Sequence, residues 1–331
     1  EILIGLVGSE MCIRDRCECV NVRKVVIVGC GFVGSASAFA LMQSGLFSEM
    51  VLIDVDKDRA EGEAMDISHG ASFAGPMKIY AGGYEDVGDA SIIVITAGAN
   101  QKPNETRLDL VQKNSKIMTD VVTQIKEQEY KGILLIVSNP VDIMTQVAME
   151  VSGFPEHRVF GSGTVLDSAR LRYHLGQHLG VDSRSVHAFV IGEHGDSEIA
   201  AWSSANVSGV PLNSFCEMRG HFNHEGNTES IEEQVKNSAY EIIAKKDATY
   251  YGIAMVVKRI CQAIVRDEKS IFPISLRMHG EYALEDVVLS MPAIVGARGI
   301  ETTIPISLDE KEVSRLHESA EMLRETRKEI R

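Results

Sequence analysis

A short glycine motif limits what this chain can fold into. Gly29, Gly31 and Gly34 lie directly after a run of apolar, β-branched residues at 24–28. An alanine-rich helical segment follows them and ends before Gly45. In this setting the first glycine permits a tight turn, the second lets the backbone approach a pyrophosphate, and the third lets helix and strand pack closely. Because the helix N-terminus also attracts phosphate, the motif predicts a dinucleotide-binding unit.

An acidic residue at the end of the next expected strand narrows the choice of dinucleotide. Asp54 follows Gly34 by 20 residues, after an apolar run at 50–53. A carboxylate there accepts hydrogen bonds from the ribose hydroxyls and would repel a 2′-phosphate. We therefore expect NAD rather than NADP. The alternative is a glycine turn that binds no ligand.

The order of the expected elements predicts an α/β protein of two domains. Apolar runs alternate with helical segments over 21–162, which is typical of a doubly wound parallel (Rossmann) sheet. Helical segments dominate 163–331, with a few alternating runs, which indicates an α+β catalytic domain. The expected strands are 24–28, 50–53, 78–81, 92–96, 133–137, 186–191, 271–275 and 286–290, and the expected helices include 57–70, 107–130, 164–179, 228–246, 248–267 and 309–328.

Charge and hydropathy exclude several classes of partner. The formal net charge is −14 and basic residues do not cluster, so we expect no nucleic-acid partner. No apolar run approaches the roughly 18 residues that a membrane span needs. Cys30, Cys216 and Cys261 are far apart in the sequence, which predicts free thiols and a cytoplasmic location.

The first 20 residues look foreign to the rest of the chain. Residues 5–16 resemble the translation of a transposon adapter used in sequencing libraries, so we interpret 1–20 as probable non-native sequence. The apolar run near the start is too short for a signal peptide. Cys12, Cys17 and Cys19 lie in this segment without a second ligand pair at zinc-type spacing, so we expect no metal site.

Four polar segments are the candidates for catalysis. A long polar loop over 97–107 has the composition of a lid, and Asn139 follows a buried strand, at the sheet edge where ligands bind. Asp167 and Arg170 are three residues apart on one helix, and His194 lies between two glycines after an apolar strand. Taken singly, the histidine could be structural and the Asp–Arg pair a solvated ion pair.

Two of these segments carry a family resemblance. Residues 166–170 read Leu-Asp-Ser-Ala-Arg and residues 192–196 read Gly-Glu-His-Gly-Asp. Together and in this order, they resemble the lactate/malate dehydrogenase family, from about Asn21 to about Glu325. Within that family the chain is most similar to the bacterial branch that interconverts pyruvate and L-lactate and is activated by fructose 1,6-bisphosphate.

The resemblance implies a role for each candidate residue. His194 would exchange the proton on the substrate oxygen, with Asp167 orienting it and favouring its protonated form. Arg170 would bind the substrate carboxylate in a fork, and Arg107 would polarise the carbonyl. Asn139 would contact both substrate and cofactor, and its bond to Pro140 is usually cis in the family. The other implied contacts are Gln101 and Thr249 for substrate, and Gly29, Gly31, Val33, Gly34, Asp54, Arg59, Tyr84, Gly98, Ala99, Asn139 and Ile253 for NAD.

Gln101 carries the argument on substrate choice. Family members that use malate have an arginine at this loop position to pair with the second carboxylate. The neutral Gln101 would leave that carboxylate buried without a countercharge, so it fits the methyl end of pyruvate. Malate dehydrogenase, or another 2-hydroxy acid dehydrogenase, remains the alternative. Asn104 replaces the usual glycine of this loop, and asparagine tolerates positive φ better than most residues.

Two further cations match an effector site. Arg172 and His187 occupy positions that bind fructose bisphosphate in the allosteric bacterial members. The resemblance implies a homotetramer in which a two-fold axis brings both pairs together, so that a bisphosphate relieves their repulsion. Two unrelated surface cations would be the simpler interpretation.

Two other functional classes are weighed against this one. An NAD-dependent glycosidase has a related architecture but needs a metal held by Cys and His, and no such motif surrounds Cys216 or Cys261. A non-catalytic NAD-binding redox sensor would not need His194, Asp167 and Arg170 together. We therefore expect an oxidoreductase that reduces pyruvate in the cytoplasm at the end of glycolysis.

Overall fold

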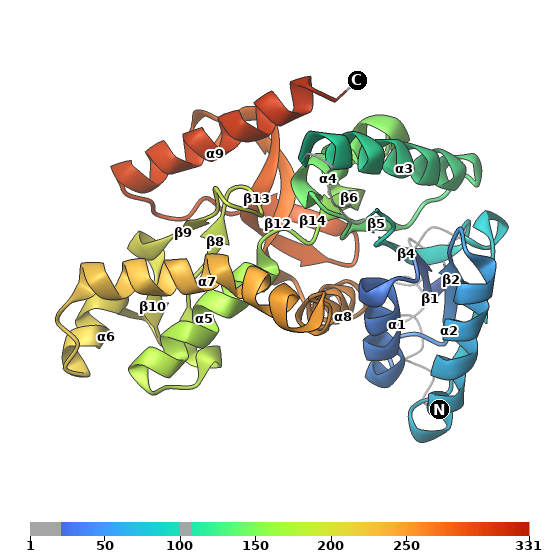
Figure 1. Cartoon of the computed structure of the whole chain (residues 1–331), viewed down its shortest axis with the longest axis horizontal. Helices are drawn as coiled ribbons and strands as arrows, with labels where there is room; N and C mark the ends of the chain where they lie inside the picture. The colour runs from blue at the N-terminus through green and yellow to red at the C-terminus, as the bar shows by residue number, and fades with distance from the viewer. Residues whose placement is uncertain (1–20, 100–106, 331) are drawn as a thin grey trace, which may run out of the picture.

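The computed structural model describes residues 21–99 and 107–330 of the chain (Figure 1). The predictions for residues 1–20, including the adapter-like segment and its three cysteines, lie outside the described residues. Gln101 and Asn104 lie outside them too, and for Arg107 only the backbone is described.

Six parallel strands form the sheet predicted for the first half of the chain. Their order is β6-β5-β4-β1-β2-β3, so the chain starts in the middle and winds outwards in both directions. The glycine motif follows the central strand β1, which is buried from Lys24 to Val28. Burial on both faces explains why these strands read as continuous apolar runs. The strands are β1 (Asn21–Val28), β2 (Glu49–Ile53), β3 (Lys78–Ala81), β4 (Ala90–Ile95), β5 (Ile133–Ile136) and β6 (Val159–Gly161).

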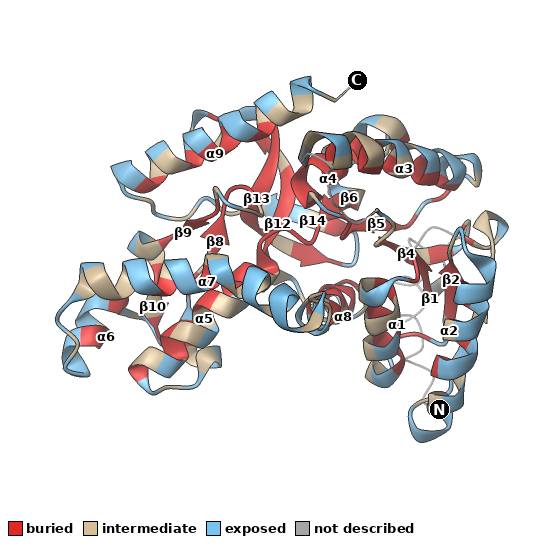
Figure 2. Ribbon diagram, viewed as in Figure 1, coloured by how far each residue is buried: buried red, intermediate tan, exposed pale blue. Residues whose placement is uncertain are grey.

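Helices cover both faces of this sheet. In Figure 1, α3 and α4 lie on one side of the strands and α1 and α8 lie on the other. Figure 2 shows that the central strands are mostly buried, while most of the outer helices bury only one side. The edge strand β3 is only partly buried. The helices are α1 (Phe32–Ser44), α2 (Lys57–Gly70), α3 (Arg107–Glu127), α4 (Val141–Ser152), α5 (Val165–Leu179), α6 (Leu212–Met218), α7 (His224–Lys246), α8 (Tyr251–Val265) and α9 (Glu310–Lys328).

The antiparallel strands of the second half continue the same sheet. β12 (Ser270–His279), β13 (Glu285–Gly296) and β14 (Gly299–Thr303) extend it beyond β6 to nine strands. The join is a single antiparallel pairing of Ser275 with Gly161, where a Cβ on the glycine would lie 2.8 Å from the Ser275 side chain. The two halves therefore share one sheet, which the composition of the chain does not reveal.

Several elements differ from their predicted limits. The strands predicted at 271–275 and 286–290 are present but extend further, to His279 and to Gly296. Most of their residues are buried, so the alternation does not mark the ends of the strands. The run predicted at 186–191 is two short strands in separate sheets, β7 (Val186–His187) and β8 (Val190–Ile191). The helix predicted from 248 begins at Tyr251, which leaves Thr249 in a loop. α4 was not predicted, since its apolar residues show no single buried face.

Some elements of the second half form a separate lobe with its own small core. α5, α6 and α7 lie at the opposite end of the molecule from α1 and α2 in Figure 1. Two small sheets belong to this half: β8 pairs with β9 (Ile199–Ala200), and β10 (Asn206–Val207) lies between β7 and β11 (Val210–Pro211). In the described part of the chain, Cys30, Cys216 and Cys261 are buried free thiols. Over the same residues, none of the helices has the length and apolar character needed to cross a bilayer.

Candidate active site

The glycine motif forms a tight loop between β1 and α1. Gly29 has φ +102°, and a Cβ there would lie 2.6 Å from the Ala97 nitrogen. A Cβ on Gly34 would lie 1.8 Å from the Gly29 carbonyl oxygen, so only glycine fits. At Gly31, by contrast, a Cβ would meet no protein atom within 4 Å. The loop is therefore closely packed at both ends and open at the middle glycine, where a pyrophosphate is expected to approach.

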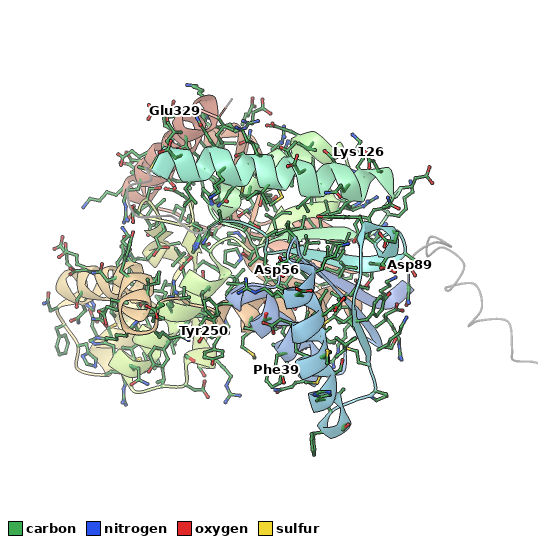
Figure 3. All side chains as sticks on the ribbon, turned by 45° about the vertical axis from the view of Figure 1, so that its right-hand side comes forward. Phe39, Asp56, Asp89, Lys126, Tyr250 and Glu329 are labelled. Atoms are coloured by element: carbon green, nitrogen blue, oxygen red, sulfur yellow. The ribbon has the colours of Figure 1, made fainter. Side chains whose placement is uncertain are left out.

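Asp54 holds this loop in place through backbone groups. One carboxylate oxygen accepts a hydrogen bond from the Cys30 N–H at 2.6 Å, and the other accepts one from the Asp56 N–H at 2.9 Å. Asp56, labelled in Figure 3, in turn caps α2. The N-terminus of α1 has no side-chain cap, so its N–H groups remain available to an anion. These features fit a pyrophosphate on the loop and a ribose at Asp54.

The other residues expected to bind NAD lie around the same edge of the sheet. Val33 and Ile253 pack partly buried against the main core, and Arg59 is exposed on α2. Burial raises the pKa of Tyr84 to about 12, so the phenol stays neutral. Gly98 and Ala99 follow β4, and the Ala99 N–H donates to the Asn114 side chain at 2.8 Å.

Asn114 is a buried residue that the sequence did not single out. Its amide nitrogen also donates to the Asn139 carbonyl oxygen at 2.9 Å. It therefore ties the segment after β4 to the segment after β5, where the Asn139–Pro140 bond is cis as expected. An asparagine within a mostly polar helix has no distinguishing signal in the sequence.

The second half contributes a linked set of charged side chains. Asp167 is 2% exposed and contacts both of its predicted partners. One of its carboxylate oxygens lies 2.6 Å from Nδ1 of His194, and the other accepts a hydrogen bond from Arg170 at 2.8 Å. The structure thus brings together three of the predicted catalytic residues. Asp167 and Arg170 are therefore a buried pair in contact with His194, not a solvated ion pair.

Electrostatics in this set favour a charged imidazole. Burial opposes a charge on His194, but the carboxylate of Asp167 outweighs it and raises the pKa of His194 to about 9. Burial likewise opposes a charge on Asp167, yet His194 and Arg170 together hold its pKa below the ordinary value. At neutral pH the arrangement is therefore an aspartate between an imidazolium and a guanidinium. His194 keeps one quarter of its side chain exposed, so the proton can reach a ligand.

Backbone contacts position the elements that carry these residues. Thr164, which precedes α5, donates its hydroxyl to the Val190 carbonyl oxygen at 2.5 Å. Ser168 on α5 accepts a hydrogen bond from the Val190 N–H at 2.8 Å. The helix bearing Asp167 is thus attached to β8, the strand that leads into the His194 loop.

Asp142 is a second acid of the site that the sequence analysis missed. It lies in the first turn of α4, is 1% exposed, and accepts a hydrogen bond from the His194 N–H at 2.8 Å. Its other oxygen accepts hydroxyl donors from Ser275 at 2.6 Å and Ser290 at 3.3 Å. Burial raises the pKa of Asp142 to about 6, although these donors oppose the shift. The one available signal was its place soon after a strand end, two residues from Pro140.

The remaining predicted substrate residues are less closely defined. Asn139 is exposed at the strand end, and Thr249 is partly buried in the loop before α8. That loop meets the glycine motif through Tyr250, labelled in Figure 3, whose ring stacks on Phe32 with centroids 5.4 Å apart. No contact joins Asn139 or Thr249 to His194 among the residues that the structure describes.

One group of side chains has the spacing of a metal site. Ligand atoms of Asp167, His194 and Glu198 lie within 4.8 Å of one another. Arg170 already supplies positive charge to Asp167, and the imidazole would have to lose its proton to bind a cation. The chemistry of the group therefore suits protons better than a metal ion.

The two cations of the expected effector site are on neighbouring elements. Arg172 is partly buried on α5 and donates to the Ser168 carbonyl oxygen at 3.1 Å, while His187 is exposed on β7. Burial lowers the pKa of Arg172. Within the described residues, no hydrogen bond or ion pair joins these two side chains.

Comparison with known proteins covers nearly the whole chain. Residues 23–161 match the lactate/malate dehydrogenase NAD binding domain, and residues 164–331 match the alpha/beta C-terminal domain of the same family. NAD is accordingly the cofactor of this chain.

Individual relatives agree with the family match. An L-lactate dehydrogenase of Acetivibrio thermocellus is 49% identical, and the alignment covers 92% of this chain and 96% of that protein. A solved lactate dehydrogenase from a Medee basin deep-sea metagenome library is 46% identical with a TM-score of 0.90, covering 93% of this chain and 98% of the other. The ligand-bound minor L-lactate dehydrogenase of Enterococcus mundtii is 42% identical with a TM-score of 0.91, with the same coverage. This chain belongs to the lactate/malate dehydrogenase family.

Proposed function

We propose that the chain interconverts (S)-lactate and pyruvate with NAD, as (S)-lactate + NAD⁺ = pyruvate + NADH + H⁺. The observation that carries the proposal is the buried carboxylate of Asp167, which contacts the imidazole of His194 and the guanidinium of Arg170 at once. This combination places a proton donor, His194, beside a cation, Arg170, that can bind the carboxylate of the substrate. The names of the relatives support lactate as the substrate.

His194 is the proposed proton donor and acceptor. Because its Nδ1 faces Asp167, its other nitrogen is the one left to meet the substrate oxygen. In pyruvate reduction that nitrogen donates its proton to the carbonyl oxygen and the imidazole becomes neutral. In lactate oxidation it accepts the hydroxyl proton. Bound NADH or NAD⁺ supplies or takes the hydride.

Arg170 and Arg107 are the proposed cations for the substrate. The Arg170 guanidinium uses one nitrogen on Asp167, and its remaining donors would bind the substrate carboxylate. Arg107 begins α3, directly after the loop that would close over the site, and it would polarise the carbonyl. Gln101 on that loop, with Asn139 and Thr249, would complete the pocket and favour pyruvate over oxaloacetate.

The cofactor would lie along the glycine loop. The N-terminus of α1 and the space at Gly31 would receive the pyrophosphate, and Asp54 would bind the adenosine ribose. We assign the remaining contacts to Gly29, Val33, Gly34, Arg59, Tyr84, Gly98, Ala99, Asn139 and Ile253. The proposed domains are 21–162 for NAD and 163–331 for substrate.

Assembly and regulation are part of the same proposal. Large apolar side chains are exposed on α1, α2 and α8, including Phe39, Met65 and Met255, and they support contact with further copies of the chain. We propose a homotetramer in which Arg172 and His187 of paired subunits bind fructose 1,6-bisphosphate as activator. The buried free thiols fit the reducing cytoplasm, where pyruvate from glycolysis is reduced.

Steady-state kinetics on the full chain test the proposal. NADH oxidation is measured with pyruvate and with oxaloacetate, each with and without fructose 1,6-bisphosphate. We expect kcat/KM to favour pyruvate by a large factor, and the bisphosphate to lower the KM for pyruvate. Comparable efficiency on both acids would overturn the substrate assignment, and an unchanged KM would overturn the effector. His194→Asn should abolish turnover while NADH fluorescence still reports binding.

A further inference from the structure

Glu198 is a buried acid next to the His194 site that the proposed mechanism does not use. It lies four residues after His194, just before β9, and is 5% exposed. Its carboxylate lies within 4.8 Å of ligand atoms of both Asp167 and His194. The hydrogen bonds described for Glu198 involve its backbone groups. A buried carboxyl group is costly to ionise.

The charges around Glu198 come from several elements. Asp167 and Arg170 face it from α5, His194 from the preceding loop, and Lys236 from α7. Arg315 on α9 donates to its backbone carbonyl oxygen at 3.4 Å. Burial is the largest influence and the negative charge of Asp167 adds to it, so the pKa of Glu198 is raised to about 8. At neutral pH the side chain is therefore mainly a neutral carboxylic acid.

The ionisation state of Glu198 acts on His194. An ionised Glu198 would place a second carboxylate near the imidazole and would attract the proton of His194 more strongly. The effect is mutual, because each of the two side chains shifts the pKa of the other.

We propose that Glu198 is a positioning residue that controls how strongly His194 holds its proton, as a third ionisable member of the Asp167–His194 pair. This rests on the proposed role of His194. As the pH rises above neutral, Glu198 and His194 lose their protons as a coupled pair, and a carboxylate on Glu198 helps to keep His194 protonated. The site thereby retains a proton for pyruvate reduction at a pH where an isolated imidazole would have lost it.

Glu198→Gln tests the proposal, because glutamine has the size of the neutral acid but cannot ionise. The measured quantity is the pH at which kcat/KM for pyruvate falls on the alkaline side. Without the carboxylate, we expect this limb to move to lower pH by about half a unit to one unit. Glu193→Gln is the matched control. Glu193 is also buried and adjacent to His194, but its carboxylate is occupied by the Ser197 hydroxyl at 2.5 Å. The control should keep the wild-type limb.

A second measurement does not depend on turnover or on the stability of the variant. Diethyl pyrocarbonate modifies an imidazole only in its neutral form. The rate at which His194 is modified, followed by peptide mass spectrometry, therefore reports the titration of that residue. In the wild-type chain we expect a titration that spreads over more than one step, because the ionisations of Glu198 and His194 are coupled. A single simple titration, or a limb unmoved in Glu198→Gln, would overturn the role of Glu198. If His194→Asn retained activity, the proposed function itself would fail instead.

Discussion

The glycine loop (residues 29–34, with Asp54) and the His194 site (Asp142, Asp167, Arg170 and His194) bind with different kinds of groups. The glycine loop offers backbone N–H groups, a helix N-terminus and empty space at Gly31. The His194 site offers charged side chains: the carboxylates of Asp142 and Asp167 are both buried, and that of Asp167 contacts His194 and Arg170. The first should therefore respond mainly to steric changes, and the second mainly to changes in charge and pH.

The largest expected effect is steric and belongs to the glycine loop. In Gly34→Ala, the new Cβ would overlap the Gly29 carbonyl oxygen, so the loop cannot keep its shape. We expect complete loss of NADH binding and a lower Tm. Gly31→Ala is the matched control, because its Cβ meets no protein atom.

That control also tests where the cofactor lies. Gly31→Ala should retain the wild-type Tm but bind NADH about tenfold more weakly or worse, because the methyl group occupies the space of the pyrophosphate. NADH fluorescence titration and thermal melting separate the two variants. Wild-type affinity in Gly31→Ala would show that no phosphate approaches this residue.

A charge change at the centre of the His194 site should have the next largest effect. Asp167→Asn keeps the shape but removes the charge that stabilises the imidazolium. We expect kcat/KM for pyruvate to fall by about a thousandfold, with NADH affinity unchanged. A loss of less than tenfold would mean that Asp167 is mainly a structural partner of Arg170.

Substitution of Asp142 should have a smaller effect. Its size depends on whether the new side chain can still accept the hydrogen bond from the His194 N–H. Asp142→Ala removes the acceptor of the His194 N–H, so the loop shifts and kcat/KM should fall by about ten- to a hundredfold. Asp142→Asn can still accept from that N–H and donate to Ser275, so it should recover most of the activity. Equal losses in the two variants would show that the charge, not the loop position, is what Asp142 provides.

The two sites also differ in how far the sequence predicted them. Gly29 and Gly34 could be predicted because backbone geometry restricts those positions to glycine, and Gly31 because a pyrophosphate is expected to approach its backbone. Asp54 could be predicted because the strand end places the acid. His194, Asp167 and Arg170 were identified by their residue types and the family resemblance. Asp142 and Glu198 were missed, because a place two residues after Pro140 or four residues after His194 does not show that folding buries these acids at the His194 site.

The fold shows the same limit. Five of the six parallel strands were predicted, mainly because burial on both faces produces continuous apolar runs. β6 is fully buried, but its three residues are too few to form a recognisable run. The continuation of the sheet into β12 was not predicted, since it depends on one contact between Gly161 and Ser275, which are distant in the sequence. Patterns within one element are visible in the chain, whereas pairings between distant elements are not.

The smallest expected effect is a difference in pH dependence between the two sites. At the glycine loop, burial raises the pKa of Cys30 to about 12, with Asp54 adding to the shift, and burial does the same for Tyr84. Both groups therefore stay neutral between pH 7 and 10, and NADH affinity should be constant over that range.

At the His194 site, the raised pKa of His194 means that the imidazolium persists up to about pH 9 and is lost as the pH rises further. Pyruvate binding should then weaken severalfold while NADH binding does not. Parallel fluorescence and kinetic titrations of the wild-type chain measure both, and a joint decline would mean that the two sites titrate as one.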